Sequence, residues 1–177
     1  MFEDSVMIVA HPDDDILWLS SVLDKVESVI FCFNDVPRNP EIGIARKKVI
    51  AEYSLPNIAS LDITEPLSFN QADWSQPVVT EYGVKLVKSQ EMDARYRDTY
   101  KKLVGMLKDR VADRKNVFTH NPWGEYGNED HVLVYQTLKN LQAEFNYQLW
   151  FSNYCSTRSI TLMNNYISGF NSRYECL

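Results

Sequence analysis

Short apolar runs alternate with amphipathic helical patterns along this sequence, and the alternation is what most constrains its fold. Runs rich in β-branched residues predict buried strands at 5–10, 28–33, 57–63, 116–119 and 147–151. Between them, apolar residues recur at helical spacing: Leu17, Val22 and Leu23; Ile44, Val49 and Tyr53; Tyr96, Tyr100, Leu103, Leu107 and Val111; Val132, Tyr135, Leu138, Leu141 and Phe145. Strands that alternate with helices favour βαβ crossovers. We therefore expect an α/β three-layer sandwich with a mainly parallel sheet of about five strands.

The chain length and composition predict one domain over 1–177. At 177 residues and 45% hydrophobic, a chain buries roughly 70% of its unfolded surface without a stabilising disulfide or metal. The composition changes at 64–80, "TEPLSFNQADWSQPVVT", which predicts a long loop and not a domain boundary.

Charge and patterning exclude several classes of partner. The net charge is −6 and no basic run follows the chain, so we expect no nucleic-acid partner. Glu3 and Asp4 stand where a signal peptide would carry positive charge, and no apolar stretch approaches the ~18 residues of a membrane span. We expect a cytoplasmic protein without a membrane span. The cysteines, Cys32, Cys155 and Cys176, lack C-x-x-C spacing, so we expect neither disulfides nor cysteine metal ligands.

All three histidines follow predicted strands at one edge of the expected sheet. "AHPDDDILWLS" places His11 and three aspartates directly after the first strand. His120 follows the strand at 116–119, and His131 lies a short loop further on. In a parallel sheet, ligands gather at the carboxyl ends of the strands.

Two interpretations of these motifs remain open from the residues alone. His11, one or two of the aspartates and His131 would give a catalytic zinc site, with the fourth position left for water. A bound cation would also neutralise carboxylates that otherwise repel one another. The alternative is plain helix capping, with Pro12 at one helix start and Asn128 before Glu129 and Asp130 at another.

Together, "AHPDDD" and "THNPWGEYGNEDH" resemble the PIG-L/LmbE family of zinc-dependent de-N-acetylases. The hallmark of that family is A-H-P-D-D-E followed later by Y-x-H-x-D-H, and the resemblance covers residues 1 to about 150. It implies a Rossmann-like fold and one zinc ion, or another transition metal, per chain. The resemblance assigns His11, Asp14 and His131 as metal ligands and Asp13 as the general base.

Further roles follow from matching positions. The resemblance implies that Tyr126 reaches the reacting carbonyl and that Arg46 holds substrate. Asp15, Asp130 and His120 are expected to support the site from behind the ligands. Trp123 either stacks against a sugar ring or simply packs the loop.

The chain departs from the family pattern in three places. Asp15 replaces a Glu. Asn128 replaces the Y-x-H histidine, so it donates a hydrogen bond but cannot release a proton. The chain also stops at Leu177 without the tail that commonly completes the substrate cleft.

The expected function is hydrolysis of an N-acetyl group from an amino sugar or glycoconjugate by a zinc-dependent deacetylase, with Asn128 and Tyr126 assisting. The oligomeric state stays open, a homo-oligomer included. One alternative is a vestigial sugar- or metal-binding module. Another is a magnesium-dependent phosphotransferase, since Asp13 and Asp15 have D-x-D spacing, although histidines favour zinc over magnesium. The turn "HPDDD" lacks the glycines of a dinucleotide site.

Overall fold

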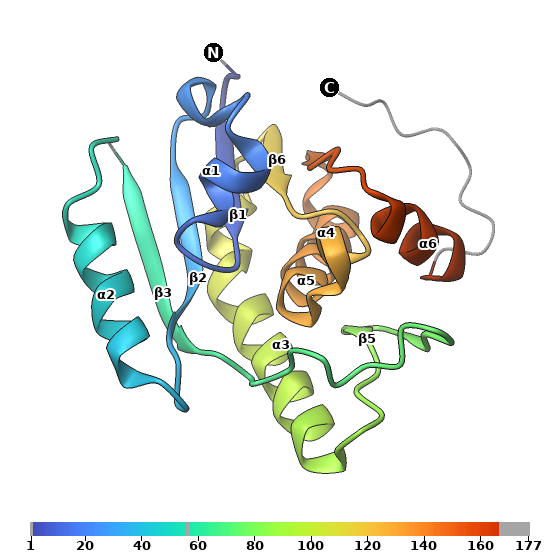
Figure 1. Ribbon diagram of the computed structural model, residues 1–177. Helices are drawn as coiled ribbons and strands as arrows, with labels where there is room; N and C mark the ends of the chain where they lie inside the picture. Colours follow the sequence, from blue (N-terminus) through green and yellow to red (C-terminus); the bar gives the residue numbers. More distant parts are fainter. Residues whose placement is uncertain (1, 56, 167–177) are drawn as a thin grey trace.

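Five parallel strands form the central sheet of the computed structural model, which describes residues 2–55 and 57–166 (Figure 1). They are β1 (Ser5–Val9), β2 (Val29–Asp35), β3 (Ile58–Thr64), β6 (Asn116–Thr119) and β7 (Gln148–Phe151). The order is β3-β2-β1-β6-β7, with every pairing parallel. The predicted α/β fold is confirmed, and each strand ends within two residues of its expected position.

The strand order reverses between β1 and β6, which creates a crevice at their carboxyl ends. From β1 the chain proceeds to β2 and β3 on one side of the sheet, and it returns as β6 and β7 on the other. Open α/β sheets bind ligands at such a switch point. The topology therefore places the segments after β1 and after β6 beside each other.

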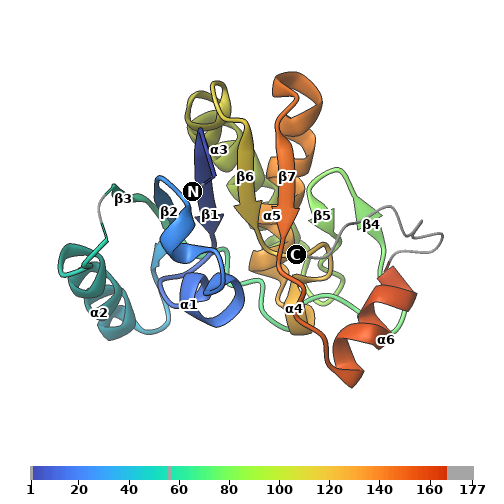
Figure 2. The same ribbon diagram turned by 90° about the horizontal axis from the view of Figure 1, so that it is seen from above.

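Helices cover both faces of the sheet, which gives three layers (Figure 2). One face carries α1 (Asp14–Leu19), the short 3-10 helix η1 (Leu23–Lys25) and α2 (Pro40–Ala51). The other carries α3 (Gln90–Val111) and α5 (Glu129–Phe145), while α4 (Gly124–Gly127) lies beside α5 and α6 (Thr157–Tyr166) lies beside α4. Tyr96, Leu103 and Leu107 of α3 are fully buried against the sheet, as their spacing predicted.

Two of the four helical patterns differ from expectation. The first helix ends at Leu19, so that Val22 is buried beyond it and Leu17 is exposed. In α2, Ile44 is 70% exposed, because Gly43 and the partly buried Ile50 face the sheet instead. A Cβ on Gly43 would lie 3.3 Å from the carbonyl oxygen of Asn34, so the small residue permits this close approach.

Apart from Thr64, the last residue of β3, the stretch predicted as a loop, 64–80, lies outside the main sheet. It contains β4 (Val79–Thr80), which pairs with β5 (Gly83–Val84) in a small antiparallel hairpin, and Ala72 bridges to Leu86. This loop packs beside α5 and brings Ser68 and Ala72 against its first turn.

Within the described ranges, every helix is too short or too polar to cross a lipid bilayer. Cys32 is buried and free, and Cys155 is exposed and free. Cys176 and the end of the C-terminal segment, 167–177, lie outside the described residues.

Candidate metal centre

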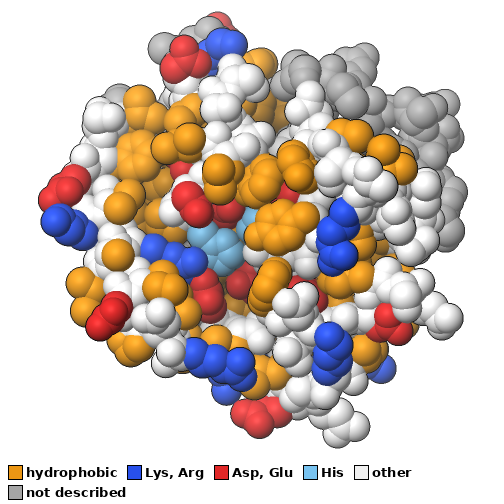
Figure 3. All heavy atoms as spheres, viewed as in Figure 1, with side chains coloured by type: hydrophobic (Ala, Val, Ile, Leu, Met, Phe, Trp, Pro, Cys, Tyr) orange, Lys and Arg blue, Asp and Glu red, His pale blue; other side chains and the backbone are white. Residues whose placement is uncertain are grey.

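The predicted site residues gather around a cavity of about 340 Å³ at the carboxyl ends of β1 and β6. A histidine is visible at the bottom of the hollow, with acidic side chains around it (Figure 3). The cavity is lined by His11, Asp13, Asp14, Leu17, Trp18, Arg46, Glu65, Phe69, Tyr126, Asn128, Asp130 and His131. Of the residues singled out from the sequence, all but Asp15, His120 and Trp123 line it.

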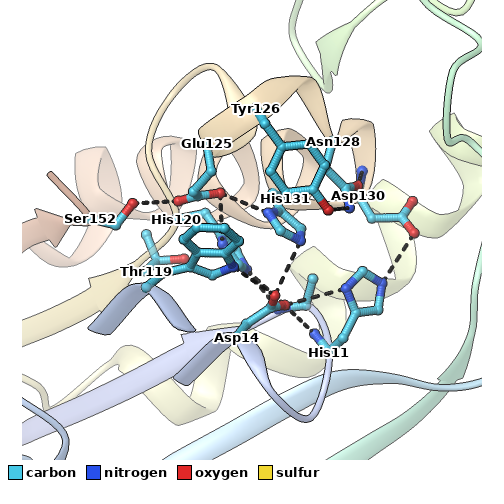
Figure 4. Close-up of polar contacts among 12 residues, drawn as sticks. His11, Asp14, Thr119, His120, Glu125, Tyr126, Asn128, Asp130, His131 and Ser152 are labelled. Atoms are coloured by element: carbon cyan, nitrogen blue, oxygen red, sulfur yellow. Dashed lines mark hydrogen bonds and ion pairs between the residues drawn. The ribbon is translucent and has the colours of Figure 1, made fainter. Parts of the chain in front are cut away.

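His11, Asp14 and His131 converge on one point and are all buried (Figure 4). Their ligand atoms lie within 4.8 Å of one another. His11 Nδ1 is 3.3 Å from Asp14 Oδ2, and His131 Nε2 is 3.4 Å from Asp14 Oδ1. Two ligands of a tetrahedral zinc, each bonded at 2.0–2.1 Å, lie about 3.3 Å apart. Two imidazoles and a carboxylate with this spacing fit zinc or a similar transition metal.

The Asp14 carboxylate is held in place from two further directions. Oδ2 accepts the backbone N–H of His11 at 2.7 Å, and Oδ1 accepts the indole N–H of Trp18 at 3.0 Å. Burial alone would raise the pKa of Asp14, but the neighbouring His131, His120 and His11 lower it well below its usual range. Asp14 is therefore an ionised carboxylate in a fixed orientation, which suits a metal ligand.

Glu125 is the buried centre of a network that orients His131. Its Oε2 accepts from His131 Nδ1 at 2.7 Å and faces His120 Nδ1 at 3.2 Å. Its Oε1 accepts the backbone N–H of Asn121 at 3.0 Å and the hydroxyl of Ser152. Burial opposes ionisation, yet the two histidines hold the pKa of Glu125 at about 2. The carboxylate fixes the proton of His131 on Nδ1 and so leaves Nε2 free for a metal.

His120 lies behind these residues, and its ligand atom is close to those of Glu125 and His131, but both of its nitrogens take part in hydrogen bonds. Its Nε2 accepts the backbone N–H of Ala10 at 2.9 Å, which assigns the proton to Nδ1, facing Glu125. The ring stacks on His131 at a centroid distance of 3.9 Å. Burial, followed by the neighbouring His131, lowers the pKa of His120, so it is neutral. Both nitrogens are engaged, as expected of a residue behind the ligands.

A second group of charges surrounds the other nitrogen of His11. Nε2 lies 3.3 Å from Glu65 Oε1 and 3.4 Å from Asp130 Oδ2. Burial lowers the pKa of His11, but hydrogen bonding to Asp130, Asp14 and Glu65 outweighs it and raises the pKa well above its usual value. Arg46, expected to hold substrate, lines the cavity but also pairs with Glu65 at 2.5 Å.

Asp13 and Asp15 have different surroundings. Asp13 is exposed on the cavity wall at φ 145°, a strained conformation, and its side chain makes no capping bond to α1. Partial desolvation at the cavity wall, followed by the charge of Asp14, raises the pKa of the Asp13 carboxyl. Asp15 is buried away from the cavity, where it accepts from the hydroxyl of Tyr53. The helix begins at Asp14 and not at Pro12, which places Asp13 at the N-cap position. Its side chain accepts no capping hydrogen bond there, so capping does not account for its carboxylate.

Asn128 is both a helix cap and a cavity residue. Its Oδ1 accepts the backbone N–H of Asp130 at 3.0 Å and caps α5, while its Nδ2 donates to the hydroxyl of Tyr126 at 3.3 Å. Trp123 is only 7% exposed and packs in the hydrophobic core, not on the cavity. This placement favours the packing alternative over contact with a sugar ring.

Sequence reasoning gave no role to Glu125 or Glu65. Glu125 lies within the quoted motif, between two glycines and midway between His120 and His131. That position could have indicated a role beside the two histidines. Glu65 follows β3 in a polar loop, and nothing in its local pattern connects it to His11. A scan against protein-family models and a search of curated proteins found no match to this chain.

Proposed function

We propose that this protein is a zinc-dependent hydrolase that removes an N-acetyl group from an amino sugar or sugar conjugate. The observation that carries the proposal is the convergence of His11, Asp14 and His131 on one point beside Asp13, in a cavity open to ligands. A structural zinc site is closed by four protein ligands, whereas three protein ligands beside a cavity are typical of a catalytic site.

The charges of the cavity also support a divalent cation. Asp13, Asp14, Glu65 and Asp130 line it, whereas Arg46 is the one Lys or Arg among its described lining residues. Carboxylates this close repel one another unless a cation lies between them. A zinc ion held by His11, Asp14 and His131 would supply Lewis-acid polarisation of the amide oxygen and a more acidic water.

The remaining residues have the positions that amide hydrolysis requires. Asp13 is exposed to the cavity and accepts the proton of the attacking water, then returns it to the departing amine. Its raised pKa makes the carboxylate a stronger base toward the water. Asn128 Nδ2 and the hydroxyl of Tyr126 lie on the same cavity and donate to the developing oxyanion, each contributing roughly 3 kcal/mol when well aimed.

The cavity volume favours a small substrate. At about 340 Å³ it lies at the lower end of the range for small-molecule sites. Arg46 lines the cavity and donates to Glu65 from Nη1, so other N–H groups of the guanidinium would be available to substrate hydroxyl oxygens. An N-acetylated amino sugar provides both the amide and the hydroxyl groups that such a site would bind.

The test combines metal analysis with amine release from a panel of N-acetyl amino sugars. Wild-type protein should hold about one zinc per chain and release amine. Asp14→Ala should lose metal and activity together, because it removes a ligand. Asp13→Asn should keep the metal and lose roughly 100-fold or more in rate, because the amide cannot accept a proton. Asp24→Asn, at an exposed acid far from the cavity, is the control and should match wild type.

A binding module with the same metal centre is the second candidate. The observation that favours it is that capping of α5 already accounts for Asn128, where the family pattern has a histidine. Zinc retained at one per chain with no amine release from any sugar would support this candidate and refute the hydrolase. Absence of bound zinc would refute both.

A further inference from the structure

The mouth of the cavity is apolar although its floor is polar. Leu17 of α1 is 59% exposed and Phe69 of the loop after β3 is 52% exposed, and both line the cavity. Trp18 lies beside them and donates its indole N–H to Asp14. Its ring packs against the rings of Tyr126 and Tyr154, with centroid distances of 5.8 and 4.9 Å. In Figure 3 apolar side chains border the histidine at the centre of the hollow.

The exposure of Leu17 and Phe69 is unusual because both side chains border the opening of the same cavity. Single exposed apolar residues are ordinary on a protein surface, whereas apolar residues that converge on a cavity mark a binding surface. The two side chains come from segments about fifty positions apart in sequence, yet they border the same hollow. The apolar surface of both side chains is removed from water only when an apolar group enters the mouth.

We propose that this mouth, made of Leu17, Phe69 and Trp18, binds an alkyl group that the substrate carries next to its sugar. The inference rests on the proposed function. The polar floor would hold the amide and the hydroxyl groups, and a cavity of this volume leaves room for little more than one sugar-sized group. A longer substituent must therefore pass Leu17 and Phe69, where it would bury apolar surface.

The chemistry is an unbranched alkyl chain of about four to six carbons, carried on either end of the sugar. It could extend the N-acyl group or replace the hydrogen of the sugar's anomeric hydroxyl. Each methylene group that leaves water strengthens binding up to about fourfold, and about twofold where half of it stays exposed. Four additional methylene groups should therefore raise affinity by at least about tenfold.

The experiment compares N-acetyl-, N-butanoyl- and N-hexanoyl-glucosamine with the hexyl glycoside of N-acetylglucosamine. We measure kcat/KM by amine release with zinc-loaded wild-type protein. We also measure Kd by calorimetry with the Asp13→Asn variant, whose turnover should be roughly 100-fold or more slower than that of wild type. We call N-hexanoyl-glucosamine and the hexyl glycoside the hexyl compounds, because each carries a six-carbon chain. For one of them, kcat/KM should rise and Kd should fall by at least about tenfold relative to N-acetylglucosamine. The compound that shows this change identifies which end of the sugar faces the mouth.

Neighbouring residues on α1 provide matched variants. Leu17→Asn and Phe69→Asn should each reduce the ratio of hexyl to acetyl affinity by about fivefold. Ile16→Asn is the control, because Ile16 is 58% exposed but lines a separate hollow of about 570 Å³ between α1 and α2. Its ratio should equal that of wild type.

The outcomes separate this inference from the proposed function. Hydrolysis of N-acetylglucosamine with no gain for either hexyl compound overturns the apolar mouth and leaves the hydrolase intact. A gain that survives both Leu17→Asn and Phe69→Asn also overturns it. Tighter binding of a hexyl compound by Asp13→Asn, lost in the Leu17 and Phe69 variants, supports the mouth even if wild type releases no amine.

Discussion

Replacing Glu125 by glutamine tests whether the buried network prepares His131 for metal binding. Glu125 is fully buried, and each carboxylate oxygen faces two donors. Glutamine keeps the size of the side chain but turns one acceptor oxygen into an NH₂ donor. The substitution therefore leaves the core volume unchanged and alters only hydrogen bonding and charge.

The structure determines how the amide should settle. The histidines need an acceptor, because His120 Nε2 already accepts from Ala10 and its proton must stay on Nδ1. The amide oxygen should face them and the NH₂ should face Ser152, whose hydroxyl can turn to accept it. The N–H of Asn121 then loses its acceptor, which costs about 1–3 kcal/mol of unfolding free energy.

Metal affinity should fall as well, in either orientation of the amide. With its oxygen toward His131, the neutral amide makes that ring a weaker base than the carboxylate does. With its NH₂ toward His131, the ring must carry its proton on Nε2, which faces Asp14 and is needed for the metal. Loss of a carboxylate that orients a ligating histidine typically weakens metal affinity by about 10–100-fold.

Urea unfolding of metal-free protein and chelator competition for zinc measure the two effects separately. Glu129→Gln is the matched control, since Glu129 is equally buried and accepts backbone N–H groups of Asn70 and Ala72 at 3.0 and 2.9 Å. It should lose similar stability but keep its zinc affinity, because it contacts no histidine. Wild-type zinc affinity in Glu125→Gln would refute the orienting role and make Glu125 purely structural.

The remaining predictions concern three other residues. His120→Ala should weaken zinc binding much less than His11→Ala or His131→Ala, measured by chelator competition, because both of its nitrogens are already engaged. Since the pKa of His11 is raised in the metal-free protein, zinc must displace a proton. Below that pKa, affinity should rise about tenfold per pH unit, and calorimetry in buffers of different ionisation enthalpy should detect about one proton released. Asn128→Asp should keep the melting temperature and metal content but lower kcat roughly 100-fold, because it caps α5 without an N–H donor. Normal turnover in that variant would reduce Asn128 to a cap.

The strands were predictable because a buried parallel strand can be recognised from its own apolar run, without information from the strands that pair with it. The helices that pack on two neighbours were equally readable, as in α3, where buried residues recur along the whole length. The pattern failed for α2, where Ile44 and Val49 face solvent. This helix approaches the sheet closely at Gly43. Glycine is not counted as an apolar residue in hydrophobic periodicity, so the sequence pattern does not reveal this contact.

The convergence of His11, the aspartates after β1 and His131 followed from topology, since carboxyl ends of parallel strands share one edge. The choice of Asp14 among those aspartates came from the family resemblance. The supporting carboxylates did not follow from the topology. Glu125 reaches the histidines because its backbone adopts φ 56° between two glycines of positive φ, a conformation that residue identity does not reveal. Glu65 meets His11 across more than fifty positions of sequence. Long-range pairs of polar side chains leave no periodic signal in either segment.

Asn128 shows why two interpretations of one motif were both reasonable and need not compete. Capping uses the side-chain oxygen, which turns toward the first N–H groups of α5. Donation to an oxyanion would use the nitrogen, which turns to the opposite side, toward Tyr126 and the cavity. An amide has both the capping oxygen and the donor nitrogen at one position. The side chains of aspartate and serine can cap but carry no N–H donor, whereas histidine can donate an N–H but is not a favoured cap. The residue that departs from the family pattern is thus one of the few that fit both environments, and its stability and catalytic roles can be separated only by a substitution that changes the nitrogen alone.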